Sequence, residues 1–169
     1  MDQIIVGMAD CRVAEGAGQV LATFALGSCI GLAIYDPQTK VGGLLHYMLP
    51  DSSIDPARGK ANPYMFADTG IPLLLEQLSG RGAMKRRLIV RAAGGAQMMD
   101  QQNVFEIGKR NYLAMRKILW KLGVLVHAEA VGGIRSRTVR LEISTGKMWL
   151  LEGGERRELI AGAPRQGGN

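Results

Sequence analysis

The chain has 169 residues, 47% of them hydrophobic, and a formal net charge of +6. This length suits one domain with its own core, which we expect over residues 1–160, with a disordered tail over 161–169. No segment approaches the roughly 18 apolar residues of a membrane span and the N-terminus does not resemble a signal peptide, so we expect a cytoplasmic protein. Two cysteines are too few for a disulfide framework or a closed zinc site, so we expect reduced thiols and no metal or cofactor.

The first part of the chain alternates short apolar runs with glycines and turn formers, a pattern typical of β-strands. The strands are expected over residues 4–8, 20–26, 29–36 and 40–49. Residues 51–62 are polar and rich in turn formers, which predicts an exposed loop.

Two helices are expected in the middle of the chain. The first begins with Asn62 as N-cap and Pro63 at the first helical position and runs toward Gly80, with a kink or a division into two shorter helices at Pro72. The second covers residues 108–122 and ends at Gly123. Its buried face is expected to contain Met115, Ile118, Leu119 and Leu122.

The remaining apolar runs are expected to be strands. They cover residues 88–96, which end in a Gly-Gly turn, and then 124–130, 138–144, 147–152 and 156–161. Strands at both ends of the chain with helices between them indicate an α+β fold.

Cys29 and His46 are the best candidates for chemistry. A hairpin turning near residues 37–40 places His46 opposite residues 30–32 and therefore close to Cys29. Such a pair can activate sulfur as a nucleophile. The turn at Gly27 and Ser28 can expose the thiol and leave backbone N–H groups free for an oxyanion. Thr23 can orient the histidine through its hydroxyl or carbonyl. Spacing alone leaves the alternative open that both residues are ordinary core side chains.

Other residues support no site. Cys11 lies in a polar segment and is expected to be an ordinary thiol, and His127 is expected to be a strand residue without a role. Gly94 and Gly95 lack the accompanying pattern of a nucleotide-binding loop, so a backbone turn near the site is the simpler interpretation. Aromatic residues make up only 5% of the chain, which argues against nucleic-acid binding despite the positive charge.

Several segments resemble the CheD family of chemoreceptor glutamine deamidases. The matching segments, in family order, are LGSCIG, GGLLHYMLPDS, FADTGI, AAGGAQM, IGKRN, VGGIRSRTV and TGKM. They extend from about Thr23 to Met148, most of the chain. The resemblance therefore does not depend on one motif.

The resemblance implies a catalytic set of Cys29, His46 and Thr23. It implies hydrolysis of glutamine side-chain amides in methyl-accepting chemotaxis receptors, giving glutamate and ammonia through a cysteine thioester and without a cofactor. It also implies mixed β-sheets packed together and flanked by helices, similar to bacterial toxin glutamine deamidases.

The implied partners are the cytoplasmic helices of the receptors and a CheC-type phosphatase. A non-catalytic regulatory module that docks on either partner is therefore the alternative to an enzyme. The positive charge favours an acidic partner, and Arg110, Arg116 and Lys117 are candidates for the docking face. We expect neither nucleic-acid binding nor membrane insertion.

Overall fold

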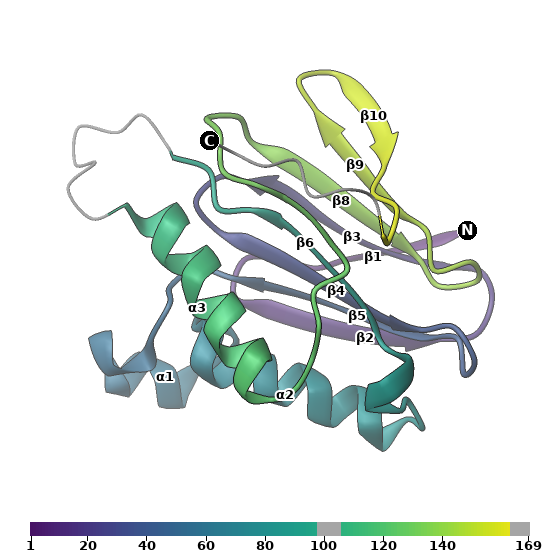
Figure 1. The fold of residues 1–169 in the computed structure, drawn as a ribbon, viewed down its shortest axis with the longest axis horizontal. Coiled ribbons are helices and arrows are strands. Elements are labelled where there is room, and N and C mark those ends of the chain that lie inside the picture. The colour runs from purple at the N-terminus through teal and green to yellow at the C-terminus, as the bar shows by residue number, and fades with distance from the viewer. Residues whose placement is uncertain (98–105, 163–169) are drawn as a thin grey trace.

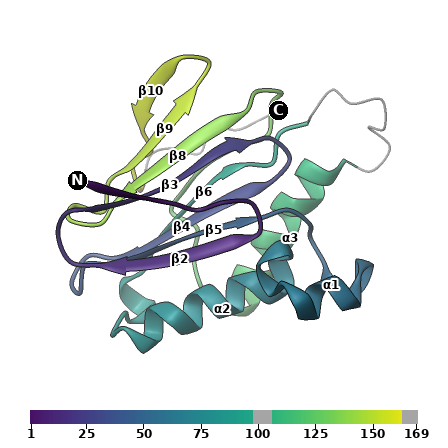
Figure 2. The ribbon, with the colours of Figure 1, turned by 180° about the vertical axis from the view of Figure 1, so that it is seen from behind.

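Two mixed β-sheets pack face to face, and helices cover the outer face of one of them (Figure 1). The computed structural model describes residues 1–97 and 106–162. The fold of these residues is α+β, as the sequence predicts, and has two packed mixed sheets, as the family resemblance implies, but it contains three α-helices where the sequence predicts two. The helices flank one side only, and the other sheet exposes its outer face (Figure 2).

The uncovered sheet, called sheet A, is antiparallel except where β1 pairs with β3 in parallel. Its strands in spatial order are β1 (Asp2–Ile5), β3 (Gln19–Leu26), β8 (Arg137–Glu142), β9 (Met148–Glu152) and β10 (Glu155–Glu158).

The helix-covered sheet, called sheet B, is antiparallel except for the parallel pair β6 and β7. Its strands in spatial order are β2 (Asp10–Glu15), β5 (Val41–Tyr47), β4 (Ile30–Asp36), β6 (Ile89–Gly94) and β7 (Ala128–Val131). The predicted hairpin is confirmed, because β4 and β5 pair with His46 opposite Gly31.

In the described part of the chain, three α-helices and three short 3₁₀ turns connect the strands. The α-helices are α1 (Pro56–Ala61), α2 (Ala67–Gly80) and α3 (Ile107–Lys121), and the 3₁₀ turns cover Ser52–Ile54, Pro63–Met65 and Lys85–Arg87. No described helix is long and apolar enough to cross a membrane. Gly123 has the left-handed backbone (φ +70°) expected just after the end of α3.

Both faces of sheet B are buried, which explains why β4 and β5 are buried along their whole lengths. The layer between the two sheets includes Leu21, Leu26, Leu44, Val139, Leu141 and Leu150. The layer between sheet B and the helices includes Leu32, Ile34, Leu45, Leu74, Met115 and Leu119. On β5, a Cβ added to Gly43 would lie 2.5 Å from Leu74 Cδ1, so this glycine allows α2 to approach the sheet.

Some elements differ from those expected. The polar segment around Cys11 forms β2, an edge strand in which only Cys11 and Ala14 are buried, so its sequence lacks the apolar alternation expected of a strand. Residues 51–62 do not form a plain loop, because the Asp55 side chain caps the short helix α1, which begins with Pro56.

The expected break at Pro72 is wrong in position. Asn62 caps a 3₁₀ turn by accepting a hydrogen bond from the Tyr64 amide. The extended backbone of Phe66 (φ −118°, ψ 143°) then separates this turn from α2, and α2 continues through Pro72. The predicted tail falls mainly in residues 163–169, which lie outside the described residues.

Asp36, at the end of β4, forms a buried ion pair with Arg87. The aspartate is 0% exposed, and its Oδ2 lies 2.8 Å from Arg87 Nη2. Burial alone would raise the pKa of this carboxyl, but hydrogen bonds from Arg87 and from the amides of Met84, Gln38 and Thr39 outweigh burial and hold the pKa well below its ordinary value. The pair fixes the segment after α2 against the end of the sheet.

We expect Asp36→Asn to lower the free energy of unfolding by about 3 kcal/mol, because Arg87 keeps its charge without its partner. The depressed pKa means that the pair stabilises the fold above the unfolded pKa of about 3.9 and loses this effect as the pH falls. Urea unfolding at pH 7 and pH 3 measures both effects, and the difference between wild type and variant should shrink at pH 3. Glu15→Gln, which breaks the exposed pair with Arg81, is the control and should change stability by less than about 1 kcal/mol. Equal losses in the two variants would contradict this account.

Candidate active site

A buried hydrogen bond joins Thr23 on β3 of sheet A to His46 on β5 of sheet B. The Thr23 hydroxyl oxygen lies 2.7 Å from His46 Nδ1 and 2.7 Å from the carbonyl oxygen of Val6, to which it donates. A hydroxyl has one hydrogen, so its oxygen must accept from Nδ1–H. This assigns the histidine proton to Nδ1 and leaves the lone pair on Nε2.

Burial favours the neutral form of His46. Its side chain is 1% exposed, and burial lowers its pKa to about 4. Nε2 is buried and has no hydrogen-bond partner among the described residues. A buried nitrogen with a free lone pair is what a general base requires.

The local backbone makes room for this contact. Gly31 lies directly opposite His46, and a Cβ at Gly31 would contact Leu26 and the Thr23 methyl group. A β-bulge follows Thr23, where the pairing of β3 with β8 shifts register, and Ala25 within it has left-handed backbone (φ +56°). The strained residue of this segment is therefore Ala25 and not Gly27.

Cys29 lies on the same face of sheet B as His46. It packs against the layer between the sheets, whereas the next residue, Ile30, packs in the layer under the helices. The thiol is half-buried. Burial raises its pKa, and the hydrogen bond from its own amide offsets this only in part. These shifts favour a neutral thiol and a neutral imidazole, in place of the thiolate–imidazolium pair considered from the sequence.

Three consecutive carbonyl groups anchor the turn before β4. The Gly27 oxygen accepts from the Ala96 amide at 2.8 Å, and the Cys29 oxygen accepts from the Gly95 amide at 2.9 Å. A Cβ on Gly94 (φ +113°) would lie 2.1 Å from the Cys29 oxygen, so only glycine fits there. The Gly-Gly turn thus lies near the site, as the sequence suggests.

Asn111 on α3 supplies the third anchor and is the site residue that the sequence analysis missed. Its Nδ2 donates to the carbonyl oxygens of Ser28 and Met48, both at 2.9 Å. One side chain thus links the turn before Cys29 to the segment after β5. Asn111 is 0% exposed and precedes the buried Met115 by four residues. A polar residue on the apolar stripe of a helix was the available signal.

The other two candidate side chains lie elsewhere. Cys11 is buried on the opposite face of sheet B from His46, and burial raises its pKa to about 12. His127 is not a strand residue as expected, because it lies just before β7; it is exposed and accepts a hydrogen bond at Nδ1 from the Val90 amide. Among residues 1–97 and 106–162, no group of three or more His, Cys, Asp or Glu side chains could hold a metal ion.

Comparisons with known proteins agree on one family. A family model described as CheD chemotactic sensory transduction matches residues 48–152. The chain is 69% identical over 169 residues to a probable chemoreceptor glutamine deamidase CheD of Solibacter usitatus, with 100% of both chains covered. It is 53% identical over 160 residues to a probable chemoreceptor glutamine deamidase CheD 1 of Syntrophus aciditrophicus, covering 94% of this chain and 100% of the relative.

Iodoacetamide should alkylate Cys29 well before Cys11 in the folded protein, because Cys29 is half-buried and Cys11 has the higher pKa. The rate at Cys29 should increase with pH through the pH range above 7, since burial raises its pKa. Peptide mass spectrometry after timed quenching measures both sites. Unfolding in urea is the control and should make the two rates similar. Faster modification of Cys11 in the folded protein would contradict the structure.

Proposed function

The chain belongs to the CheD family, and we propose that it is a chemoreceptor glutamine deamidase, as its relatives are named. The reaction is hydrolysis of glutamine side-chain amides in chemoreceptors to glutamate and ammonia. Cys29 is the nucleophile in this proposal, His46 is the acid and base, and Thr23 orients His46. The proposal places the protein in the cytoplasm, where the receptor helices that it modifies lie.

The observation that supports it most is the free Nε2 of His46 on the same face as Cys29. The pairing of His46 with Gly31 makes Cys29 its diagonal neighbour, two residues along the adjacent strand. Such neighbours have Cα atoms roughly 7–8 Å apart, within reach of a thiol and an imidazole. The Thr23 bond turns Nδ1 away from this space and leaves Nε2 to receive a proton.

The first half of the reaction forms the thioester. His46 Nε2 takes the proton of the Cys29 thiol as sulfur attacks the glutamine amide carbon. The same proton then passes to the amide nitrogen, and the carbon–nitrogen bond breaks to release ammonia. The second half returns the enzyme to its starting state: His46 takes a proton from water, the hydroxide attacks the thioester, and the thiolate that leaves recovers the proton.

The turn supports the developing oxyanion in this proposal. The carbonyl groups of Gly27, Ser28 and Cys29 are all engaged on the side of β6 and α3. The amide N–H group of Ser28 donates to no described backbone group, whereas that of Cys29 donates to its own sulfur. The Ser28 N–H group is therefore available to the oxygen of the tetrahedral intermediate.

Partners beyond the receptor stay predictions. The CheC-type phosphatase is implied by the family resemblance, and binding to it would be compatible with catalysis. A purely regulatory module would need no free base beside a thiol, which favours the enzyme.

Cys29→Ala should abolish deamidation, because no other described thiol lies on that face of the sheet. The assay is ammonia release from a purified chemoreceptor cytoplasmic fragment, with mass spectrometry to find glutamines that gain about one mass unit. Cys11→Ala is the matched control and should keep wild-type activity. Activity retained in Cys29→Ala would exclude the nucleophile assignment.

Thr23→Val should lower kcat on the order of 10²-fold, because the methyl group cannot accept from Nδ1–H and the histidine loses its assigned tautomer. Thr23→Ser restores a hydroxyl and should recover most of the activity. A Thr23→Val enzyme of wild-type rate would show that the hydroxyl does not orient the base.

The pH dependence of the wild-type enzyme tests the protonation state of His46. The value of kcat/KM should persist to about pH 5 and fall as His46 is protonated near its pKa of about 4.

A further inference from the structure

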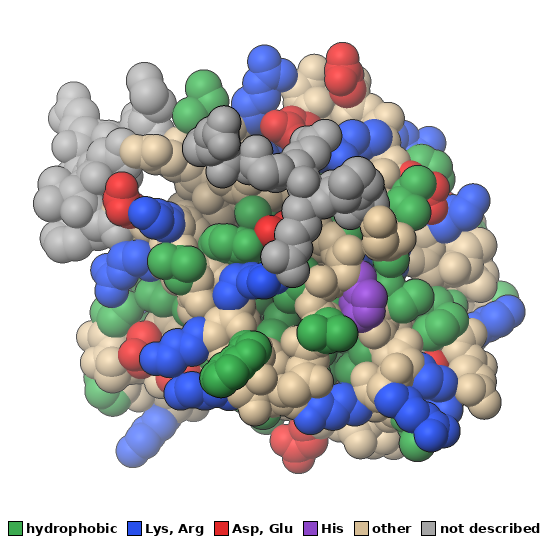
Figure 3. Space-filling view, in the orientation of Figure 1, with side chains coloured by type: hydrophobic (Ala, Val, Ile, Leu, Met, Phe, Trp, Pro, Cys, Tyr) green, Lys and Arg blue, Asp and Glu red, His purple; other side chains and the backbone are tan. Residues whose placement is uncertain are grey.

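The outer side of α3 carries exposed cationic and large apolar side chains together. We call this surface the α3 face, and its exposed residues are Lys109, Arg110, Leu113, Lys117, Trp120 and Lys121. Leu113 is 52% exposed and Trp120 is 80% exposed. Figure 3 shows basic side chains among apolar ones along the course of α3.

The two apolar residues form a row on the helix. Leu113 and Trp120 are seven residues apart, which is about two turns, so they lie above one another. Lys109 and Lys117 lie within about 60° of that row on an ideal helix of 100° per residue. Cationic side chains thus flank an exposed apolar row on this side of α3. The opposite side of the helix is buried against the core, so it does not account for the exposed row.

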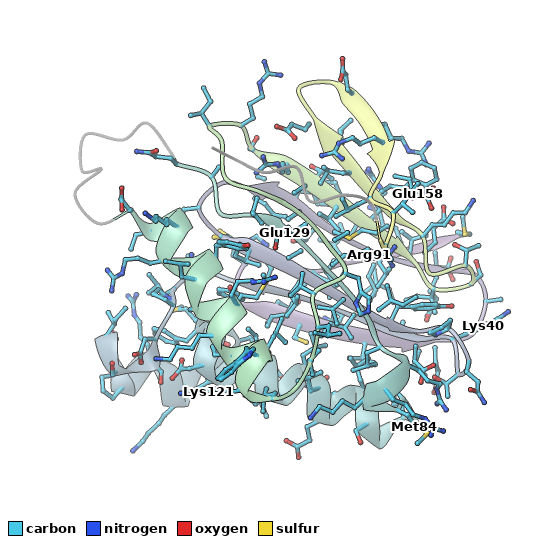
Figure 4. The ribbon with its side chains drawn as sticks, in the orientation of Figure 1. Lys40, Met84, Arg91, Lys121, Glu129 and Glu158 are labelled. Atoms are coloured by element: carbon cyan, nitrogen blue, oxygen red, sulfur yellow. The ribbon has the colours of Figure 1, made fainter. Side chains whose placement is uncertain are left out.

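Few acidic groups neutralise these cations. Lys117 lies near Asp51, whose pKa is lowered mainly by its hydrogen bonds with Ser53 and to a smaller extent by this lysine. Lys109, Arg110 and Lys121 form no ion pair with other described residues. Lys121 extends from the end of α3 (Figure 4).

Arg116, which the sequence grouped with Arg110 and Lys117, belongs elsewhere. It is half-buried, and its Nη1 lies 3.8 Å from Glu129 Oε2. Of the three docking residues that charge alone suggests, Arg110 and Lys117 therefore belong to the α3 face and Arg116 does not.

We propose that the α3 face binds an acidic, amphipathic helix of the chemoreceptor substrate. This inference rests on the proposed deamidase function and adds the surface that recognises the receptor. Apolar residues of the partner would pack on Leu113 and Trp120, while its carboxylates would pair with the flanking cations.

The shape of the surface favours a helix over an anionic membrane. A helix that lies in a membrane interface presents a broad apolar face, whereas α3 offers a narrow row of two residues. A row of heptad spacing with cations beside it matches the packing of one helix along another.

The α3 face also runs toward the catalytic turn. Asn111, on the buried side of α3, holds the Ser28 carbonyl next to Cys29. A receptor helix along α3 would therefore be anchored to the same element that positions the nucleophile. Docking of this kind lowers KM and selects glutamines by their distance from the bound helix.

Trp120 provides a direct test. In a Cys29→Ala/Trp149→Phe protein, Trp120 is the sole tryptophan, since the chain has two. Titration with a chemoreceptor cytoplasmic fragment should move its emission to shorter wavelength, because docking removes the ring from water. The same shift seen with anionic phospholipid vesicles and not with the fragment would overturn the proposal in favour of a membrane.

Charge reversal tests the cations. Lys117→Glu/Lys121→Glu should weaken fragment binding at least tenfold and raise KM for the fragment, with little change in kcat. Lys147→Glu/Arg157→Glu changes two exposed cations, one in the turn before β9 and one on β10, by the same charge and should leave binding within twofold. Equal effects of the two pairs of substitutions would mean that binding depends on general electrostatic attraction, and would exclude the α3 face as the docking surface.

The two proposals fail differently. If the wild-type enzyme deamidates the fragment while Trp120 emission stays unchanged at saturating fragment, the deamidase function stands and the α3 face is wrong. If Trp120 responds to the fragment but no glutamine gains one mass unit, the surface binds receptors and the deamidase function is wrong. If neither occurs, both are wrong.

Discussion

The hydrogen bond between Thr23 and His46 is the contact on which the site depends, because it joins the two sheets at the point where chemistry is expected. Thr23 donates to Val6 and accepts from His46, so the tautomer of the histidine is set by the backbone just after β1 of sheet A. A histidine on a strand would otherwise be free to present either nitrogen. The packing of one sheet on the other thus determines which nitrogen is basic.

The position of Cys29 has a different origin. Its turn is held by carbonyl groups that accept from the amides of Gly95 and Ala96, just after β6, and from Asn111 of α3. Asn111 also links this turn to the segment after the histidine strand, because it donates to the carbonyl groups of both Ser28 and Met48. The helix layer therefore orients the sulfur, whereas the second sheet orients the base.

Burial also defines the charge states with which the proposed reaction begins. It raises the pKa of Cys29 and lowers that of His46, so the proton is transferred during attack and is not separated beforehand. Burial of Thr23 and His46 also strengthens the hydrogen bond between them. The exposed outer side of α3 contrasts with this dry interior, and the two functions proposed for that helix, anchoring and docking, fall on its opposite sides.

Much of this could be read from the sequence. The apolar periodicity predicted the α+β class and the β4–β5 hairpin, and the hairpin register brought His46 opposite Gly31, because strand pairing is local. The edge strand β2 and the short helix α1 were missed, since exposed polar residues conceal both. Thr23 was named as a partner of His46, but only the packing of the two sheets decides the tautomer and the free Nε2. Asn111 lies 82 residues along the chain from Cys29, and no local pattern relates them. The sequence by itself determined which residues could do chemistry, whereas the tertiary structure decided their orientation, because contacts between layers depend on distant segments meeting.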